Sequence, residues 1–496
     1  MAELVGAAGV GVGAEPALVV LDEVRGLRAG SARGRKALII CTDIARYGVG
    51  SPGDVYKVSV GGTRNLGSGN QTFNGSVVAS GGAHVYADGT VVGGTGGLTQ
   101  SGGTVTLNGT NNLLAVAAGT QVVLADQVVG AGNLTKLGAG SLALSNQFGG
   151  ASTYTGQTTV AAGPLVAQSA TALGASGNVI VAGTGAALQL RALPTVGGFA
   201  MSRPLFLYGA GVGGAGAVEN QFGFNTVAGT TVLAATTLGV TAGVLTQAGV
   251  MSGPGDLTKA GGGMLGLTQA NSFLGALNVA AGVVQLTLQT FALGAATGGT
   301  TVQAGATLFI NNTGQFNGDT ITLNGTGAAS FNLAGALVVS QSVNVGSNLV
   351  MNPGASVGVS AGATVTFGGN ISGAGDLTKV GGGTAVLVAN STVAGNTVVN
   401  GGTLLLQGSS TQGGGTLLNT AGVIVNAGAT FQVDNSNGGV TPNLANRVAD
   451  AAPISLNGGT LQYIANPGLG LAPLANAERL GAVTIGAGTA TVNVGY

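Results

Sequence analysis

The chain lacks most of the residue types on which catalytic and nucleic-acid-binding sites depend. Its 496 residues include one cysteine (Cys41), one histidine (His84) and no tryptophan, and only 6% are charged. One cysteine excludes an intrachain disulfide, and a zinc site needs a cluster of histidine and cysteine ligands. The 15 basic and 15 acidic residues give no net charge, whereas nucleic-acid binding requires clustered lysine and arginine. We therefore assign no catalytic, cofactor-binding or metal-ligating residue, and we expect neither a cofactor nor a nucleic-acid partner.

Long apolar runs and a leader sequence are also missing. Every apolar stretch is interrupted by glycine or a polar residue before it reaches the length of a transmembrane helix. Residues 1–20 contain Glu3 and Glu15 and no basic residue, which is unlike a secretory signal peptide. The sequence predicts neither a membrane-spanning helix nor a cleavable leader.

Glycine and small apolar residues are abundant instead. Glycine accounts for 97 residues, without the every-third-residue period of collagen, and 45% of the chain is hydrophobic. Low charge with high hydrophobicity is the opposite of the composition of disordered chains. Valine and threonine favour strands and glycine favours turns, so we predict an all-β protein.

A seven-residue phrase, the heptad, organises the sequence. It reads GAGNLTK at 130–136, GPGDLTK at 253–259 and GAGDLTK at 373–379, with starts 123 and 120 residues apart. Each copy continues to a large residue two positions before a glycine: Tyr154 before Gly156, Phe273 before Gly275, and Val393 before Gly395. Repetition at a fixed period is the signature of a repeat architecture.

A shorter phrase recurs at uneven intervals and predicts how each repeat is built. It combines a glycine, a small residue and a threonine with alternating apolar residues, as in SGGTVTL from Ser101 and AGATVTF from Ala361. Glycine adopts the positive φ of a corner, and the alternating residues form a short strand that must stack on its neighbours. In Leu142–Leu144 the leucines should point one way and Ala143 the other. We predict a β-solenoid of parallel coils with roughly 20 residues per coil.

An antiparallel sandwich or barrel is the alternative fold. Hairpins of that kind favour tight turns at Asn-Gly or Asp-Gly. Such dipeptides occur, for example at Asn108–Gly109 and Asn324–Gly325. The long-period repetition favours the solenoid.

Residues 1–55 differ from the rest of the chain because they hold many of its charged residues. We treat them as an N-terminal extension or cap, in part disordered, in which Pro16–Leu27 predicts a short helix and Lys36–Cys41 a strand. Residues 56–496 form the predicted β-helix repeat region, with repeat units starting near 130, 253 and 373.

The heptads contain the only lysines after Lys57, each three residues after an asparagine or aspartate. The pairs are Asn133 with Lys136, Asp256 with Lys259, and Asp376 with Lys379. Positions i and i+3 of a strand point to opposite faces, so the two side chains should not converge on a ligand. We expect the asparagine or aspartate to cap a turn and the lysine to point outward and keep an exposed strand soluble.

The heptad and its continuation resemble the autotransporter-associated β-strand repeat of bacterial autotransporter passengers. That motif is G-x-G-x-L-T-K-x-G-x-G-x-L-x-L, then N-x-Y/F-x-G-x-T-x-V-x-A-G. Residues 130–163 and 253–282 follow it, and residues 373–402 follow it with Val393 in the aromatic position. The resemblance implies a right-handed parallel β-helix at the cell surface or outer membrane, or secreted, that helps passenger transport and folding. A translocator barrel or another outer-membrane anchor is expected, but the last 100 residues lack its strand pattern.

Matches to catalytic motifs are weak. Gly211–Gly216 fits the dinucleotide pattern G-x-G-x-x-G, but no βαβ unit follows it. Gly354–Gly358 fits the nucleophile elbow of hydrolases, but His84 precedes it, whereas that family places its histidine later. We therefore expect a non-enzymatic stalk or adhesin segment with glycans or cell surfaces as partners.

A carbohydrate-active β-helix enzyme, either a polysaccharide lyase or a hydrolase, is the alternative function. Such an enzyme needs carboxylates that converge from neighbouring coils. Two carboxylates with an arginine or lysine in one groove would favour it.

Overall fold

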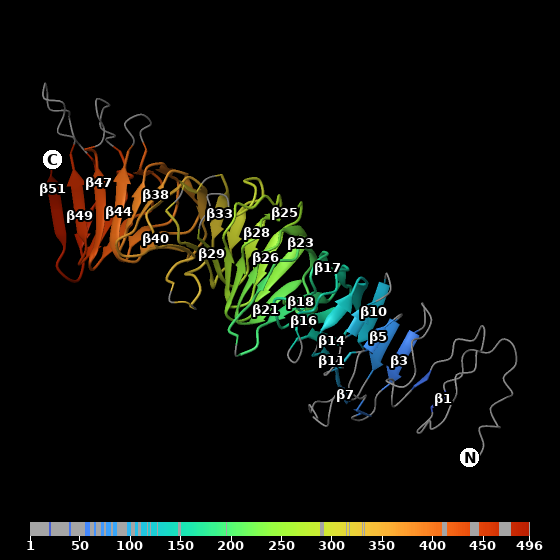
Figure 1. Cartoon of the computed structure of the whole chain (residues 1–496). Helices are drawn as coiled ribbons and strands as arrows, with labels where there is room; N and C mark the ends of the chain where they lie inside the picture. Colours follow the sequence, from blue (N-terminus) through green and yellow to red (C-terminus); the bar gives the residue numbers. More distant parts are fainter. Residues whose placement is uncertain are drawn as a thin grey trace, which may run out of the picture. The chain divides into compact units, whose positions relative to one another are not determined.

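The computed structural model describes most of the chain from residue 127 to residue 495. The residues left out of this range are 147–149, 195, 288–291, 314, 317, 330, 332, 409–413, 437–445 and 466–477. Before residue 127 it describes the turn at 118–119, residue 125 and the strands β1–β11. The chain divides into two compact units, residues 1–193 and 194–496, and both consist of short strands (Figure 1).

The first unit contains the strands up to residue 191. They are β1 (Val19–Val20), β2 (Ile39–Ile40), β3 (Val55–Ser59), β4 (Arg64–Asn65), β5 (Gln71–Phe73), β6 (Ser76–Ser80), β7 (Ala83–Tyr86), β8 (Gly97–Gln100), β9 (Val105–Leu107), β10 (Asn111–Val116), β11 (Gln121–Leu124), β12 (Val128–Gly130), β13 (Asn133–Leu137), β14 (Ser141–Leu144), β15 (Thr158–Val160), β16 (Gly163–Ala167), β17 (Val179–Ala182) and β18 (Ala186–Arg191).

The second unit contains three parallel sheets. Sheet one consists of β20 (Leu205–Gly209), β21 (Val218–Phe222), β23 (Thr231–Val240), β25 (Met251–Ser252), β26 (Leu257–Ala260), β28 (Leu277–Val279), β30 (Thr300–Val302), β33 (Thr320–Leu323), β36 (Asn348–Met351), β39 (Ile371–Ser372), β42 (Asn390–Ser391) and β45 (Thr416–Leu417). Sheet two consists of β19 (Ala200–Met201), β22 (Phe224–Val227), β24 (Val244–Gln247), β27 (Met264–Leu267), β29 (Gly282–Leu286), β31 (Ala306–Ile310), β34 (Leu337–Val339), β37 (Ser356–Val359), β40 (Leu377–Val380), β43 (Thr397–Val399), β46 (Val423–Asn426), β48 (Ile454–Asn457) and β50 (Val483–Ile485). Sheet three consists of β32 (Gln315–Phe316), β35 (Val343–Val345), β38 (Thr364–Phe367), β41 (Thr384–Leu387), β44 (Gly402–Gln407), β47 (Ala429–Asp434), β49 (Thr460–Ile464) and β51 (Thr491–Gly495). A 3-10 turn, η3 (Val212–Gly214), separates β20 from β21.

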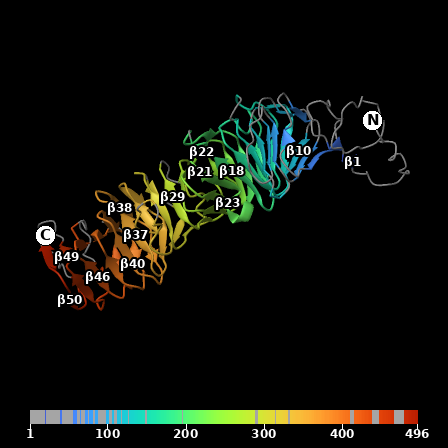
Figure 2. The ribbon, with the colours of Figure 1, turned by 90° about the horizontal axis from the view of Figure 1, so that it is seen from below.

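Parallel pairing between successive turns defines the fold and confirms the predicted all-β parallel solenoid. The strands of sheet two, such as β37, β40 and β46 in Figure 2, stack in sequence order. The strand pairs of the described residues run parallel, and the exception is an isolated antiparallel bridge between Asn426 and Gly458. The antiparallel alternative is therefore wrong. Asn324–Gly325, offered as a hairpin turn, is a corner in which Gly325 has a φ of 71°.

The heptads do not keep to one face of the solenoid. From Leu257 the chain pairs in turn with Leu277, Thr300, Ile321, Leu349 and Ile371, which makes five turns in 114 residues. The third heptad strand, β40, comes one strand later and lies in sheet two, whereas the second, β26, lies in sheet one. The 120 residues between the second and third heptads therefore cover five full turns and one further strand, which places the third heptad on a different face. Single turns vary from 20 to 28 residues.

Alternation along each strand sends one set of side chains into the core. Leu142 and Leu144 are fully buried, as predicted, while Ala143 is also buried at 3% exposure. Each such residue stacks on its equivalents in the turns above and below: Leu257, Leu277, Thr300, Ile321, Leu349 and Ile371 form one buried column. Burial of one aliphatic side chain contributes roughly 1.5–3 kcal/mol, so columns of this kind stabilise the stack.

The aromatic position of the repeat fills the core beside a glycine of the next turn. Tyr154 and Phe273 are completely buried, and the Tyr154 hydroxyl lies 2.6 Å from Thr158 Oγ1. A Cβ at Gly174 would lie 2.7 Å from the Tyr154 ring, and one at Gly294 would lie 2.7 Å from the Phe273 ring. The bulky ring therefore requires a glycine on the turn that covers it.

The N-terminal extension departs from one expectation. Val19–Val20, within the segment predicted as a helix, form β1 and pair in parallel with Ile39–Ile40 of β2. β2 agrees with the predicted strand at Lys36–Cys41. Apart from these strands and the start of β3, residues 1–55 lie outside the described residues. Among the residues that the structure describes, no helix has the length and apolar character needed to cross a membrane.

Replacing Phe273 with alanine should lower the free energy of unfolding by about 3–5 kcal/mol, because the ring leaves a cavity under Gly294. Chemical denaturation monitored by circular dichroism measures this. The neighbouring Leu274 is 59% exposed, so Leu274→Ala is the matched control and should change stability by less than about 0.5 kcal/mol. Equal effects of the two substitutions would contradict the proposed packing.

Candidate functional site

The heptads are the first candidate site, because they hold the only lysines after Lys57. In all three, the asparagine or aspartate accepts a hydrogen bond from a backbone N–H of the next turn. The pairs are Gln157 N to Asn133 Oδ1 at 2.8 Å, Ala276 N to Asp256 Oδ1 at 2.8 Å, and Asn396 N to Asp376 Oδ1 at 2.7 Å. The side chains thus pair with the backbone as predicted, but they join two successive turns of the solenoid instead of capping a turn of their own.

The heptad lysines lie inside the solenoid, so the prediction that they point outward is wrong. Lys136, Lys259 and Lys379 are at most 1% exposed. Each takes a core position: Lys259, for example, stacks between Leu238 and Val279, which are both buried. The reason is the period of the strand, because a residue two positions after a buried leucine points the same way.

Each lysine ammonium group donates to three backbone carbonyls at a corner. Lys136 Nζ contacts the carbonyl oxygens of Leu137, Gly138 and Ala162 at 3.0, 2.7 and 2.9 Å. Lys259 Nζ contacts those of Gly261, Gly263 and Ala281 at 2.5, 2.6 and 2.8 Å. Lys379 Nζ contacts those of Val380, Gly381 and Gly401 at 3.4, 2.5 and 2.7 Å. In every copy the last carbonyl belongs to the next turn, so the lysine ties two corners together and uses all three of its N–H donors.

Glycine is required where the lysine head approaches the backbone. A Cβ at Gly282 would lie 2.5 Å from Lys259 Nζ, and one at Gly402 would lie 2.7 Å from Lys379 Nζ. Both glycines also have a positive φ, of 67° and 59°. The backbone carbonyls of the preceding turn lie at least as close to these two glycines, so the glycines fit both the corner and the ammonium group.

Burial changes the titration of these lysines. It lowers the pKa of Lys259 to about 7, and the pKa values of Lys136 and Lys379 to about 8. A lysine with a lowered pKa can serve as a nucleophile or base, but a substrate would have to reach it. The three heptad lysines are enclosed by backbone, and their aspartate or asparagine partners lie on the opposite face of the strand. The arrangement supports structure rather than catalysis.

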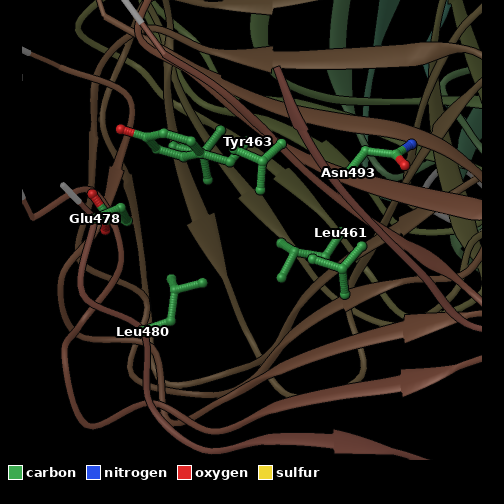
Figure 3. A pocket seen from close by; sticks show the side chains of 8 residues that line it. Leu461, Tyr463, Glu478, Leu480 and Asn493 are labelled. Carbon is green, nitrogen blue, oxygen red and sulfur yellow. The ribbon is translucent and has the colours of Figure 1, made fainter. Parts of the chain in front are cut away.

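A cavity at the last turns is the second candidate site (Figure 3). It has a volume of about 260 Å³ and is lined by Val433, Leu461, Tyr463, Glu478, Leu480, Val492, Asn493 and Val494. Glu478 is its one acidic lining residue. The Glu478 carboxylate accepts the backbone N–H groups of Arg447 and Val448 at 2.8–3.1 Å, while burial raises its pKa.

The charges beside this cavity bear on the enzyme alternative. Arg447 is 5% exposed and lies within electrostatic range of both Glu478 and Asp434. Asp434 is not among the lining residues, and its Oδ1 accepts the backbone N–H and hydroxyl of Ser436. Arg447 Nε donates to Asn435 Oδ1 at 2.6 Å. The cluster thus fastens a loop to the final turns and does not present two carboxylates to one cavity. Within the described part of the chain, no group of three or more histidine, cysteine, aspartate or glutamate residues could hold a metal ion.

The glycine-rich matches to catalytic motifs lie at corners. Gly211–Gly216 forms a loop around η3, closed by a hydrogen bond from Gly216 N to Ala210 O at 2.8 Å. Gly354 has a φ of 79° at the corner before β37, and the serine of that motif, Ser356, is buried. A third feature was not predicted from the sequence. Four aromatic side chains are exposed on the outer surface: Phe206, Tyr208, Phe222 and Phe224. Its signal was available, because five of the twenty aromatic residues lie between Phe199 and Phe224.

Asp256→Asn should leave the free energy of unfolding almost unchanged, because Asn133 forms the equivalent bond in the first repeat with an amide oxygen. Asp256→Ala should lower it by about 1 kcal/mol, since the Ala276 N–H loses its acceptor. Denaturant titration of both variants measures the difference. A large loss with asparagine would show that the negative charge itself matters.

Stability should rise with pH above about 7, the pKa of buried Lys259. In the unfolded chain that lysine keeps its proton up to a pKa of 10.5, so between these values the unfolded state binds more protons and rising pH favours folding. The rise should be at most about 1.4 kcal/mol per pH unit for each lysine. Lys259→Met should remove one lysine's share of the slope, most clearly between pH 7 and about 8, where Lys136 and Lys379 contribute less; Thr258→Ala, on the outer side of the same strand, should not change the slope. Identical slopes for the wild type and Lys259→Met would disprove the assignment.

Comparisons with known proteins agree with this geometry. Three segments match the passenger-associated-transport-repeat family: residues 134–167, 257–286 and 377–406. Each matched segment begins on a heptad strand and ends on the strand after the lysine-bound corner, so it contains both turns that the lysine joins. No solved structure matches the chain.

One curated relative is the adhesin BmaC autotransporter of Brucella suis biovar 1 (strain 1330). It is 32% identical over 223 residues, which is 43% of this chain. The match spans only 6% of the length of that adhesin. Autotransporter relatives imply a surface or secreted location. The chain thus contains three segments that match the passenger-associated transport repeat within a parallel β-solenoid, and it is similar to part of an autotransporter adhesin.

Proposed function

We propose that the chain is a non-enzymatic, passenger-like stalk and adhesin segment, displayed at the outer membrane or released from it. The family repeat and the adhesin relative support the passenger role. The contacts of the carboxylate groups, most of which accept hydrogen bonds from the protein itself, support the non-enzymatic role.

Six of the seven acidic side chains of the described residues from 127 onward accept at least one hydrogen bond from the protein itself. Three of them, Asp256, Asp376 and Glu478, accept backbone N–H groups. Glu219, Asp319 and Asp434 accept side-chain hydroxyls of Thr241, Thr300 and Ser436. Asp450 lies 3.8 Å from Arg479 at the surface. Glycosidases need one free acid and one free base or nucleophile on either side of the scissile bond, so this distribution favours adhesion over hydrolysis.

The outer surface suits many weak contacts. Exposed or half-exposed threonine, serine and asparagine alternate with the buried residues along the strands, as in Thr364 and Thr366 of β38. Asparagines also form ladders between turns, with Asn426 Nδ2 donating to Asn400 Oδ1 at 2.5 Å and Asn457 Nδ2 donating to Asn426 Oδ1 at 3.1 Å. Such faces offer uncharged donors and acceptors to glycans or cell surfaces.

Fluorescent beads coated with the full chain should attach to bacterial or epithelial cell layers more than beads coated with serum albumin. Bead counts after washing measure attachment. Since few charges are involved, attachment should change little between 0.05 and about 0.5 M salt, unlike attachment driven by surface charge.

Two results would overturn the proposal. Attachment no greater than that of albumin-coated beads would remove the adhesive role. Release of new reducing ends or unsaturated sugars from polygalacturonate, xylan or other polysaccharides would establish the enzyme alternative instead.

A further inference from the structure

Two pairs of aromatic side chains lie on the outside of the second unit. Phe206 and Tyr208 occupy alternate positions of β20, 37% and 53% exposed, between leucines that are buried. Phe222 ends β21 and Phe224 begins β22, 48% and 70% exposed. We call these four residues the aromatic surface.

This exposure is unusual for the molecule. Several other aromatic rings of the second unit fill the core, and Phe273, Phe367 and Phe431 are at most 2% exposed. Phe331 is exposed as a single residue at 44%, whereas residues 206–224 gather four exposed rings. The inward positions of β20 are filled by Leu205 and Leu207, so the core does not need the two rings beside them. Each exposed ring loses the stabilisation that burial would give, which indicates a role outside the core.

Phe206 and Tyr208 lie on the same face of β20, beside smaller side chains of the next turn. Alternate residues of a strand are roughly 6.7 Å apart on one face, so Phe206 and Tyr208 present two neighbouring rings. On the next turn Phe206 stacks on Val232, and Val232 stacks on Ser252. Beside Tyr208 that turn carries only the small Ala234 and Ala235, at a break in the strand register. Small neighbours leave the ring faces open to a ligand.

Uncharged polar groups border these rings. Thr230 is exposed and its carbonyl accepts the Leu205 N–H at 2.9 Å, which places it beside the start of β20. Near the second pair, the exposed Thr241 donates through Oγ1 to Glu219. The charged residues closest in sequence, Arg203 and Glu219, are buried. Residues 199–247 therefore combine exposed aromatic rings with hydroxyls, and the two charged residues of this stretch are buried.

This chemistry fits a neutral sugar chain better than other ligands. One face of a pyranose ring carries C–H groups that complement the electron-rich face of an aromatic ring, and its hydroxyls pair with threonine or serine. Phosphates or acidic sugars would need exposed cations. A stable protein interface buries about 800 Å² per partner, more than two ring pairs set among small residues provide.

We propose that the aromatic surface binds an uncharged oligosaccharide, with sugar rings stacked on Phe206 and Tyr208 of sheet one and, further along the same turn, on Phe222 at the end of β21 and Phe224 at the start of β22. The site deepens the adhesive function proposed above and rests on it. The loop of residues 210–217 separates the two pairs along the chain, and its Gly213 and Gly214 are exposed, so backbone groups are also available to the ligand there.

The test is calorimetric titration of the full chain with cellohexaose, chitohexaose, laminarihexaose and mannohexaose. At least one should bind, and Phe206→Ser with Tyr208→Ser should weaken that binding about tenfold or more, as should Phe222→Ser with Phe224→Ser. Leu274→Ser, which removes another exposed apolar side chain, is the matched control and should bind like the wild type. Thermal unfolding of each variant shows that the fold is retained.

Several outcomes would overturn the proposal. These are the absence of binding to all four hexasaccharides, equal binding by the wild type and both double variants, and tighter binding of an oligogalacturonate than of any neutral sugar. A concentration-dependent dimer in the wild type that the double variants lose would assign the aromatic surface to a second copy instead. If beads coated with the double variants attach to cells as the wild type does, this site is wrong while the adhesive function stands. If sugars bind but wild-type beads do not attach, the adhesive function fails and the site remains.

Discussion

Pairing between successive turns is the interaction on which everything else in this solenoid depends. A strand of three to five residues makes too few contacts to be stable alone, and here each is hydrogen-bonded in parallel to the turn before and the turn after. A single backbone hydrogen bond contributes only about 1 kcal/mol net, so stability comes from many bonds added along the stack, as in other repeat proteins. The register must then be kept at every corner, because a slip of one residue would turn the core face outward.

The heptad lysine solves the problem that corners create. A corner turns carbonyl groups toward the interior, where an unpaired acceptor is costly, and one buried ammonium group satisfies three of them from two successive turns. The lysine in turn requires a glycine opposite its head group, since a Cβ there would lie within 2.5 Å of Lys259 Nζ. Burying a charge is unfavourable in itself, and the lowered pKa of Lys259 reflects this. Lysine and glycine in consecutive turns therefore pack against each other in the second and third repeats, at Lys259 with Gly282 and at Lys379 with Gly402.

The sequence was sufficient to predict the parallel solenoid, the corners and the pairing of Asn133, Asp256 and Asp376 with the backbone. The sequence also allowed the burial of the lysines to be predicted, because Leu257 and Lys259 are two residues apart on one strand and must share a face. The expectation that charge points to solvent outweighed that alternation, and only the structure shows the carbonyls that make burial acceptable. The change of face between the second and third heptads was not predictable, since it depends on loops that vary from turn to turn. The exposure of Phe206 and Tyr208 was hidden for a different reason: Leu205–Tyr208 is apolar throughout, so alternation cannot say which side faces the core.

The distribution of charge and aromatic groups separates the parts of the molecule that hold the stack from the part that can meet a ligand. Lysines and carboxylates, which would be the usual surface groups, are used at corners and caps, and their loss from the surface leaves hydroxyls and amides there. Four exposed rings then interrupt this polar surface within a single stretch of about twenty residues. Beside Phe206 and Tyr208 the next turns carry valine, alanine and serine, which are smaller than the rings. A solenoid can change the outward residues of one turn without disturbing the core columns, since alternate positions are independent. The repeat fixes the fold through its inward positions and leaves its outward positions free to vary. A ligand would then be recognised by the outward residues of a few turns and not by the repeat itself.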